Sequence, residues 1–180
     1  MIPLYILAGG KSSRFGSDKA RAEIDGQPLI TRVADRLAPV VGATTVVADV
    51  VDKYIDLNLR TIADIEPGLG PMGGLATALG DVEGEELLLV SCDMANLEPA
   101  WVGLLTATPG PVVAFRGTRG WEPLFGLYRR AVASQVQDSI ASGELSMQEL
   151  LDRTATAVAL PANWAGSINT PQDLEALRGG

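Results

Sequence analysis

Histidine is absent from this 180-residue chain, and Cys92 is its single cysteine. The missing histidine excludes Ser-His-Asp and Cys-His nucleophilic sites and removes the commonest zinc ligand. One cysteine excludes intramolecular disulfides and cysteine zinc clusters. With no histidine to activate it, Cys92 is expected to be a small core residue rather than a nucleophile. A bound metal would then have oxygen ligands, which favours Mg²⁺ or Mn²⁺.

Long apolar runs and net positive charge are also missing. No run approaches the roughly 18 apolar residues that span a bilayer, and the N-terminus lacks the basic opening of a signal peptide. The formal net charge of −8 argues against nucleic acid as a partner, since a nucleic-acid binder needs a basic face. We therefore expect a cytoplasmic protein without membrane or nucleic-acid partners. Four of its 14 Lys and Arg residues nevertheless gather within residues 11–21, a cluster suited to a small anion or simply to solvent.

Predicted strands and helices alternate along the chain, which indicates a mostly parallel sheet with helices on both faces. The length of 180 residues favours one domain, residues 1–180, because two halves would each be marginal in size. Apolar and β-branched runs predict strands at Leu4–Ala8, Thr44–Val50, Leu59–Ala63, Glu86–Ser91, Pro111–Arg116, Glu122–Tyr128 and Ala155–Leu160. Helical spacing and capping signals predict helices at 28–37, Gly73–Leu79, Glu98–Ala107, Arg130–Ser142 and Ser146–Arg153, and a last helix opened by Thr170 and Pro171.

Three groups of polar or glycine residues follow predicted parallel strands: Ala8-Gly9-Gly10, Asp64 and Asp93. Ligands of such sheets bind beyond the carboxyl ends of the strands. Each aspartate is suited to hold a divalent ion there, and each is equally suited to cap a helix or turn. The coincidence of all three groups at strand ends predicts a ligand site at one edge of the sheet.

The segment Leu7–Lys19 is rich in glycine and cations. Glycines let backbone N–H groups approach phosphate oxygens closely, Arg14 can grip two oxygens through its planar fork, and Lys19 adds a compact charge. The segment fits neither G-x-G-x-x-G nor the Walker spacing. It is therefore either a phosphate-binding loop of another kind or a plain connection between a strand and a helix. The later stretch Pro67–Leu75 is likewise either a backbone surface that reads a base edge or a stiff connector.

Leu7–Ala20 resembles the signature of the molybdenum cofactor guanylyltransferases, and more loosely that of the sugar-phosphate and cofactor nucleotidyltransferases. Further matches follow in the family's order, so the resemblance spans nearly the whole chain. It implies a Rossmann-like three-layer α/β/α sandwich of the nucleotide-diphospho-sugar transferase type. These matches are Asp64 with Pro67–Leu75, Cys92-Asp93-Met94, Glu122–Tyr128 and Ile168–Leu174.

The resemblance also implies roles for individual residues. Leu7, Ala8 and Gly9, followed by Gly10, match the turn that contacts the guanosine, and Lys19 matches a phosphate-binding lysine that acts with Arg14. Asp64 matches a nucleotide-contacting aspartate, and Gly70 and Pro71 belong to a guanine-selective loop. Asp93 matches the magnesium ligand. Asn169 is expected near the metal and the acceptor phosphate.

The implied reaction transfers GMP from GTP to the phosphate of molybdenum-molybdopterin and releases pyrophosphate, with Mg²⁺ as cofactor and Mn²⁺ as its alternative. Transient contacts with proteins that deliver the pterin or mature molybdoenzymes are implied as well. Two positions depart from the family, since Ser167 and the pair Ala48-Asp49 stand where asparagines are common. Three alternatives therefore stay open: a molybdopterin cytidylyltransferase, a sugar-phosphate nucleotidyltransferase, and a nucleotide-binding protein without turnover.

Overall fold

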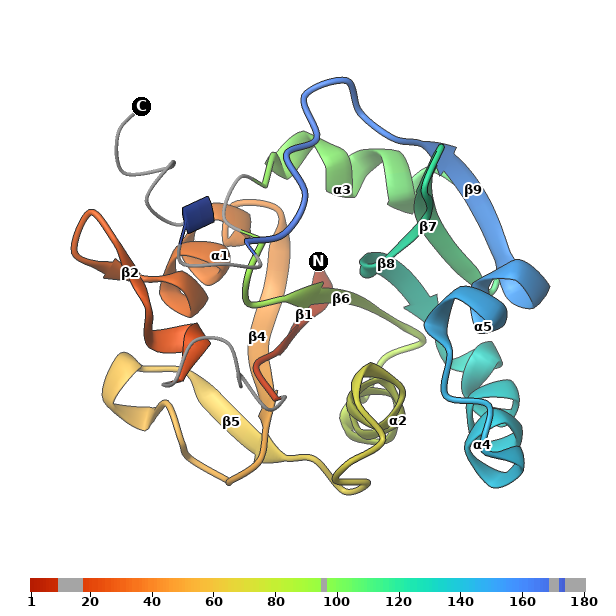
Figure 1. The fold of residues 1–180 in the computed structure, drawn as a ribbon, viewed down its shortest axis with the longest axis horizontal. Coiled ribbons are helices and arrows are strands. Elements are labelled where there is room, and N and C mark those ends of the chain that lie inside the picture. The colour runs from red at the N-terminus through yellow and green to blue at the C-terminus, as the bar shows by residue number, and fades with distance from the viewer. Residues whose placement is uncertain (10–17, 95–96, 169–171, 174–180) are drawn as a thin grey trace.

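A seven-stranded sheet forms the centre of the computed structural model, which describes residues 1–9, 18–94, 97–168 and 172–173. The strand order is β5-β4-β1-β6-β8-β7-β9 (Figure 1). Of these seven strands β8 runs antiparallel to its two neighbours, and the other pairs are parallel. The mostly parallel sheet is thereby confirmed. The strands are β1 (Ile2–Leu7), β4 (Val41–Ala48), β5 (Arg60–Ala63), β6 (Glu86–Ser91), β7 (Val112–Gly117), β8 (Gly120–Arg129) and β9 (Ala155–Ala159).

Helices cover both faces of this sheet (Figure 1). On one face, the buried side chains of α1 (Leu29–Leu37) and α3 (Pro99–Thr106) pack with strand side chains in one apolar cluster. On the other, α2 (Pro71–Asp81), α4 (Ala133–Ser142) and α5 (Met147–Thr154) pack on a second cluster. Leu87–Val90 of β6 are fully buried, as expected for a continuous apolar run between two helical layers. The predicted three-layer α/β/α architecture is confirmed.

Helix termini follow the local chemistry. Pro71 begins α2, two residues before the predicted Gly73, because proline suits the first helical position, whose N–H has no partner within the helix. Gly143 ends α4 at φ +77°, and Ser146 Oγ accepts a hydrogen bond of 3.3 Å from Glu149 N at the start of α5. The predicted helix Arg130–Ser142 is divided, since Arg130–Val132 form a 3₁₀ turn (η3) before α4. Of the helix predicted to open at Thr170 and Pro171, the structure describes residues 172–173, which are helical, and the rest lies outside the described residues.

Short elements between β1 and β5 were not among the predicted ones. The strands β2 (Glu23–Ile24) and β3 (Gln27–Pro28) form a hairpin whose turn residues Asp25 and Gly26 have positive φ angles. Asp-Gly is a residue pair that such two-residue turns favour. The 3₁₀ turns η1 (Lys19–Arg21) and η2 (Ile55–Leu57) are also short elements between β1 and β5.

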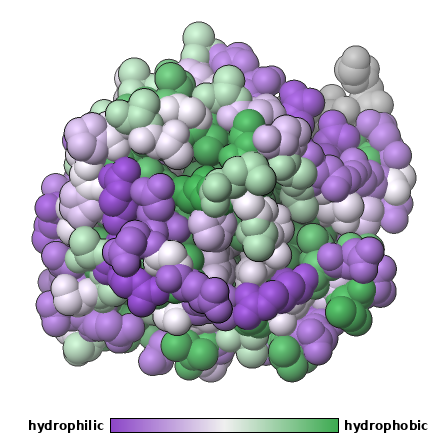
Figure 2. Space-filling view, turned by 180° about the vertical axis from the view of Figure 1, so that it is seen from behind, coloured by the Kyte–Doolittle hydropathy of each residue, from purple (hydrophilic) through white to green (hydrophobic). Residues whose placement is uncertain are grey.

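The surface is mixed in character. Figure 2 shows hydrophilic and hydrophobic residues interspersed across the face seen from behind. Within the part of the chain that the structure describes, no helix is long and apolar enough to cross a membrane.

Candidate active site

The carboxyl ends of four neighbouring parallel strands meet at one edge of the sheet. Backbone hydrogen bonds continue across these ends: Cys92 N donates to Leu7 O at 3.1 Å, Ala8 N to Val47 O at 2.9 Å, and Asp64 N to Ala48 O at 2.7 Å. The structure therefore places Ala8-Gly9, Asp64 and Asp93 along the edge where the sequence predicts them. Their roles toward a ligand stay predictions.

An ion pair occupies this edge. Lys19 Nζ in η1 donates at 2.6 Å to Oδ2 of Asp93, which lies two residues after the end of β6, and the two side chains are 16% and 15% exposed. Ile168 N donates to Asp93 O at 3.0 Å, which brings the C-terminal segment to the same place. Residues that are 74 positions apart in the sequence are thus joined in one small polar site.

The second carboxylate oxygen of Asp93 suits a cation. Asp93 Oδ1 is buried and has no hydrogen-bond partner among the described residues, an arrangement that ordinarily costs about 1–3 kcal/mol. The described residues hold no group of three or more acidic, histidine or cysteine side chains close enough to form a metal cage. A single carboxylate is what Mg²⁺ uses when nucleotide phosphates and water supply its other ligands. The residues present therefore fit Mg²⁺ held by Asp93.

The turn that carries Lys19 is held from both sides. Asp18 Oδ1 accepts a 3.1 Å hydrogen bond from Ala20 N, and Ala20 is 1% exposed. Tyr54, which is fully buried, donates its hydroxyl to Asp18 Oδ2 at 2.9 Å. The sequence prediction assigned no role to Asp18 and did not single out Tyr54, because no local pattern links residues 36 positions apart.

The Asp64 side chain forms hydrogen bonds with the loop that leads to α2 and with α2 itself. Its Oδ1 accepts hydrogen bonds from Thr77 Oγ1 at 2.9 Å and from Glu66 N at 3.0 Å, while Thr77 Oγ1 accepts from Ile65 N at 3.0 Å. These contacts fix the loop against the helix. The geometry thus gives Asp64 a structural task at the site edge beside the nucleotide contact that the resemblance implies.

Glycines bring the start of α2 close to the strand ends. Gly70 adopts φ +62° and ψ −145°, a conformation open essentially to glycine. A Cβ atom on Gly73 would lie 2.6 Å from Glu66 O, and one on Gly74 would lie 2.8 Å from Leu7 Cδ2. Close packing therefore explains Gly73 and Gly74, whereas Gly70 and Pro71 are exposed at the edge and keep their predicted role in base recognition.

The cysteine beside Asp93 has a thiol of low reactivity. Cys92 is buried, and burial together with the neighbouring Asp93 carboxylate raises the pKa of its thiol to about 12. A thiol with that pKa carries almost no thiolate at neutral pH, so Cys92 does not act as a nucleophile. This agrees with the expectation of a core residue.

Known proteins resemble the chain over nearly its whole length. The family model for the MobA-like NTP transferase domain matches residues 4–158. The chain belongs to this family. A relative from Deinococcus radiodurans named probable molybdenum cofactor guanylyltransferase is 36% identical, over 99% of this chain and 96% of the relative. One of the same name from Nostoc is 33% identical over 97% and 89%.

Solved structures agree with this membership in the MobA-like family. Molybdopterin-guanine dinucleotide biosynthesis protein A from Archaeoglobus fulgidus superposes with a TM-score of 0.80 at 22% identity, covering 98% of this chain and 97% of the other. A putative protein from Aquifex aeolicus superposes with a TM-score of 0.79 at 28% identity and 93% coverage of both chains. At 22% identity the likeness is one of fold, the nucleotide-diphospho-sugar transferase type of α/β sandwich. The chain is thus a nucleotidyltransferase of this fold.

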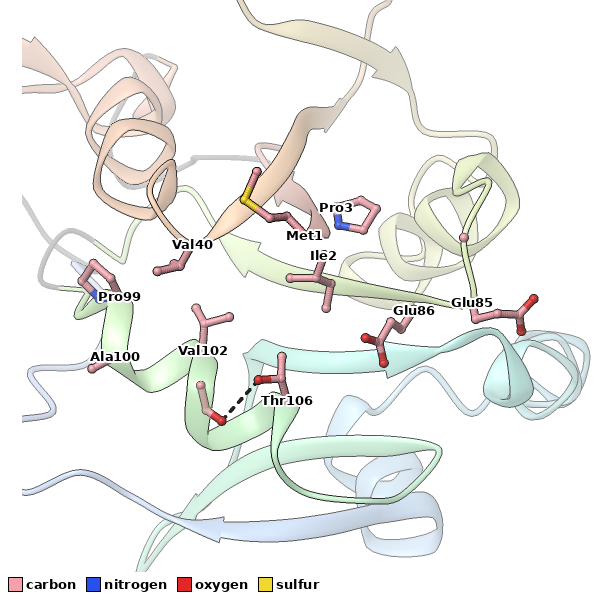
Figure 3. Close-up of a pocket in the computed structure, with 12 residues that line it drawn as sticks. Met1, Ile2, Pro3, Val40, Glu85, Glu86, Pro99, Ala100, Val102 and Thr106 are labelled. Atoms are coloured by element: carbon pink, nitrogen blue, oxygen red, sulfur yellow. Dashed lines mark hydrogen bonds between the residues drawn. The ribbon is translucent and has the colours of Figure 1, made fainter.

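A cavity of about 650 Å³ lies away from the predicted nucleotide site of this MobA-like transferase. Figure 3 shows the starts of β1 and β6 and one side of α3 around it. Since β1 and β6 are parallel, these starts lie at the amino edge of the sheet, opposite Lys19 and Asp93.

Three predicted site residues, Gly10, Arg14 and Asn169, fall outside the described residues.

Proposed function

We propose that this MobA-like transferase moves the GMP unit of GTP to the phosphate of molybdenum-molybdopterin, forming a guanine dinucleotide cofactor and releasing pyrophosphate. The observation that carries the proposal is the Lys19–Asp93 pair at 2.6 Å, placed beside Ala8-Gly9 at the carboxyl edge of a sheet of the nucleotidyltransferase type. The names of the relatives from Deinococcus radiodurans and Nostoc support guanine and the pterin as nucleobase and acceptor.

The chemistry needs no protein nucleophile. An acceptor phosphate oxygen attacks the α-phosphorus of GTP in line, so that one O–P bond forms while the bond to the leaving pyrophosphate breaks. Alignment and neutralisation of charge are sufficient for such transfers. The absence of histidine and the inert thiol of Cys92 are consistent with this mechanism.

Each side chain of the site has a task in that displacement. Lys19 binds the triphosphate and stabilises the charge that gathers on the leaving pyrophosphate, with Arg14 as the proposed second cation. Asp93 holds a divalent cation through its unpartnered Oδ1. When bound, Mg²⁺ (or Mn²⁺) supplies positive charge to the phosphate oxygens. Asn169 is proposed to lie on the side of the acceptor phosphate.

The nucleoside is held by the backbone of the strand ends. We assign its binding to Leu7, Ala8, Gly9 and Gly10, with Asp64 alongside. Gly70 and Pro71 present main-chain groups to the guanine. The proposed reaction also needs a source of pterin and a user of the product, which is why transient contacts with proteins of those two kinds belong to the proposal.

The test compares nucleotides directly. The purified protein is incubated with Mg²⁺, molybdenum-loaded molybdopterin and GTP, CTP, ATP or UTP in turn, and dinucleotide products are detected by mass. A guanine dinucleotide formed from GTP alone is the expected result. A cytosine dinucleotide, or pyrophosphate released with a sugar phosphate as acceptor, would replace the proposal by another transferase. Binding of GTP without any product would indicate a protein without turnover.

A further inference from the structure

The carboxylate of Asp18 is the central acceptor of a small network at the base of the Lys19 turn. Its Oδ1 accepts from Ala20 N at 3.1 Å, which makes Asp18 the N-cap residue of η1. Its Oδ2 accepts from the Tyr54 hydroxyl at 2.9 Å and faces Lys53 Nζ at 3.4 Å. One carboxylate thus ties the turn that carries Lys19 to the segment between β4 and β5.

Tyr54 is a rigid anchor for this network. Its side chain is fully buried in the apolar cluster under α1 and α3. Its backbone accepts hydrogen bonds from Leu57 N and Leu59 N at 3.0 and 3.2 Å. Burial, and then the Asp18 carboxylate, raise the pKa of the Tyr54 hydroxyl well above its usual value, so the hydroxyl remains a donor throughout the neutral range. A buried donor in a fixed place leaves the Asp18 carboxylate one favourable position.

The neighbouring cations Arg21 and Lys53 lie 3.9 and 3.4 Å from Asp18 Oδ2 and make shorter contacts with other carboxylates. Arg21 donates to both carboxylate oxygens of Asp56, at 2.8 and 2.9 Å, and also to Lys53 O at 2.8 Å. Lys53 Nζ lies 2.7 Å from Asp49 Oδ1. Lys19, by contrast, extends to Asp93 at the strand end. The two cations of the turn therefore point in different directions: Arg21 is paired with Asp56, and Lys19 extends into the predicted phosphate site.

We propose that Asp18 and Tyr54 are positioning residues, an Asp18–Tyr54 clasp that holds Lys19 within reach of the nucleotide triphosphate. The inference rests on the proposed function, because it takes the triphosphate to be the ligand of Lys19. A lysine side chain is flexible, and its binding to phosphate is strongest when the backbone beneath it is already ordered. The clasp supplies that order through Ala20 N and the buried ring of Tyr54.

The first test removes one hydroxyl. Tyr54→Phe keeps the buried ring and deletes its hydrogen bond to Asp18, so the dissociation constant for GTP with Mg²⁺, measured by calorimetry, should rise, by at most about fivefold, which is the equivalent of the whole free energy of one hydrogen bond. Tyr5→Phe is the matched control, since the Tyr5 hydroxyl donates to Asp81 at 2.8 Å and this contact involves the far end of α2. The control should lose similar thermal stability and keep the wild-type affinity. Asp18→Ala should weaken GTP binding further than Tyr54→Phe does.

The second test asks whether the effect passes through Lys19. In a Lys19→Gln background, Tyr54→Phe should cause no additional loss of GTP affinity, because no lysine is left to position. An equal loss in both backgrounds would overturn the clasp, as would a Tyr54→Phe protein that binds GTP like Tyr5→Phe. If the wild-type protein binds no GTP, the proposed function itself fails and the clasp fails with it. Wild-type binding thus separates the two failures.

Discussion

Asp93 combines two tasks in one carboxylate, with Oδ2 on Lys19 at 2.6 Å and Oδ1 buried without a partner among the described residues. Asp93→Asn keeps the shape of the side chain and removes its charge, so we expect pyrophosphate release with GTP, Mg²⁺ and acceptor to fall by at least about a hundredfold. The melting temperature should change little. Cys92→Ala is the adjacent control and should keep turnover, because the thiol is inert. Near-normal turnover by Asp93→Asn would remove Asp93 from the reaction.

The same ion pair predicts two opposite effects of one substitution. Lys19 competes with a metal ion for Asp93, so Lys19→Gln should strengthen Mn²⁺ binding without nucleotide by about tenfold. The affinity of the Lys19→Gln protein for GTP should fall by on the order of 2 kcal/mol, about thirtyfold, because the charge-assisted contact between Lys19 and the triphosphate is lost. Electron paramagnetic resonance measures free Mn²⁺, and calorimetry measures GTP. Arg153→Gln removes a cation paired with Glu144 on another part of the surface and should change neither value. A Lys19→Gln protein in which both affinities fall would contradict the competition.

At the residue scale, local motifs predict the site residues that follow strands, but not the residues that hold these site residues in place. Lys19 and Asp93 stand in motifs that can be read locally, and the structure joins them. The Asp18–Tyr54 contact depends on how the segment between β4 and β5 packs under α1, which no local spacing encodes. Thr77, which binds Asp64 at 2.9 Å, was missed for the same reason. Gly10, Arg14 and Asn169 stay predictions.

At the scale of the element, α2 shows how closely a helix can be packed against the site. Gly73→Ala would place a Cβ 2.6 Å from the backbone oxygen of Glu66, so we expect a loss of about 1–3 kcal/mol in the free energy of unfolding. Gly80 lies in the same helix with nothing within 4 Å of an added Cβ. Gly80→Ala should therefore raise stability by about 0.5–1 kcal/mol through helix propensity. Urea unfolding measures both, and equal effects of the two substitutions would show that close packing does not matter here.

Element boundaries reveal what the sequence pattern can and cannot predict. The buried run Leu87–Val90 predicts β6 within the observed Glu86–Ser91, because continuous apolar residues suit a strand covered on both faces. The hairpin β2–β3 is too short for periodicity to reveal, although Asp25-Gly26 signals its turn. The antiparallel direction of β8 is a tertiary choice, which local sequence does not decide.

On the scale of the whole molecule, one sheet runs from β5 to β9 and includes strands from both halves of the sequence. A shared sheet gives the halves a common core on each face, which supports the prediction that residues 1–180 form a single nucleotidyltransferase domain. The cytoplasmic location likewise stays a prediction.

The joint between α2 and the edge of this sheet gives the molecule an acid-sensitive point. Asp81 accepts from both guanidinium nitrogens of Arg60 at 2.7 and 2.8 Å and from the Tyr5 hydroxyl at 2.8 Å. Hydrogen bonding to Arg60, followed by that to Tyr5, holds the pKa of Asp81 below its usual value. A depressed folded-state pKa stabilises the protein above the unfolded pKa of about 3.9, and this stability is lost as the pH falls through the folded pKa.

We therefore expect the free energy of unfolding of the wild-type protein to fall as the pH decreases below about 4, as the general behaviour of paired carboxylates requires. Asp81→Asn cannot ionise, so it should be less stable at pH 7 and should lose less stability on acidification. Urea unfolding between neutral pH and the lowest pH at which the protein stays folded measures the difference. Glu144→Gln is the control, because Glu144 is exposed and its side chain pairs with the exposed Arg153 at 2.7 Å, a surface pair of small energy. Parallel pH profiles for the wild type and Asp81→Asn would show that this joint does not set the acid limit, whereas converging profiles would assign it to Asp81, the carboxylate that links α2 to β1 and β5.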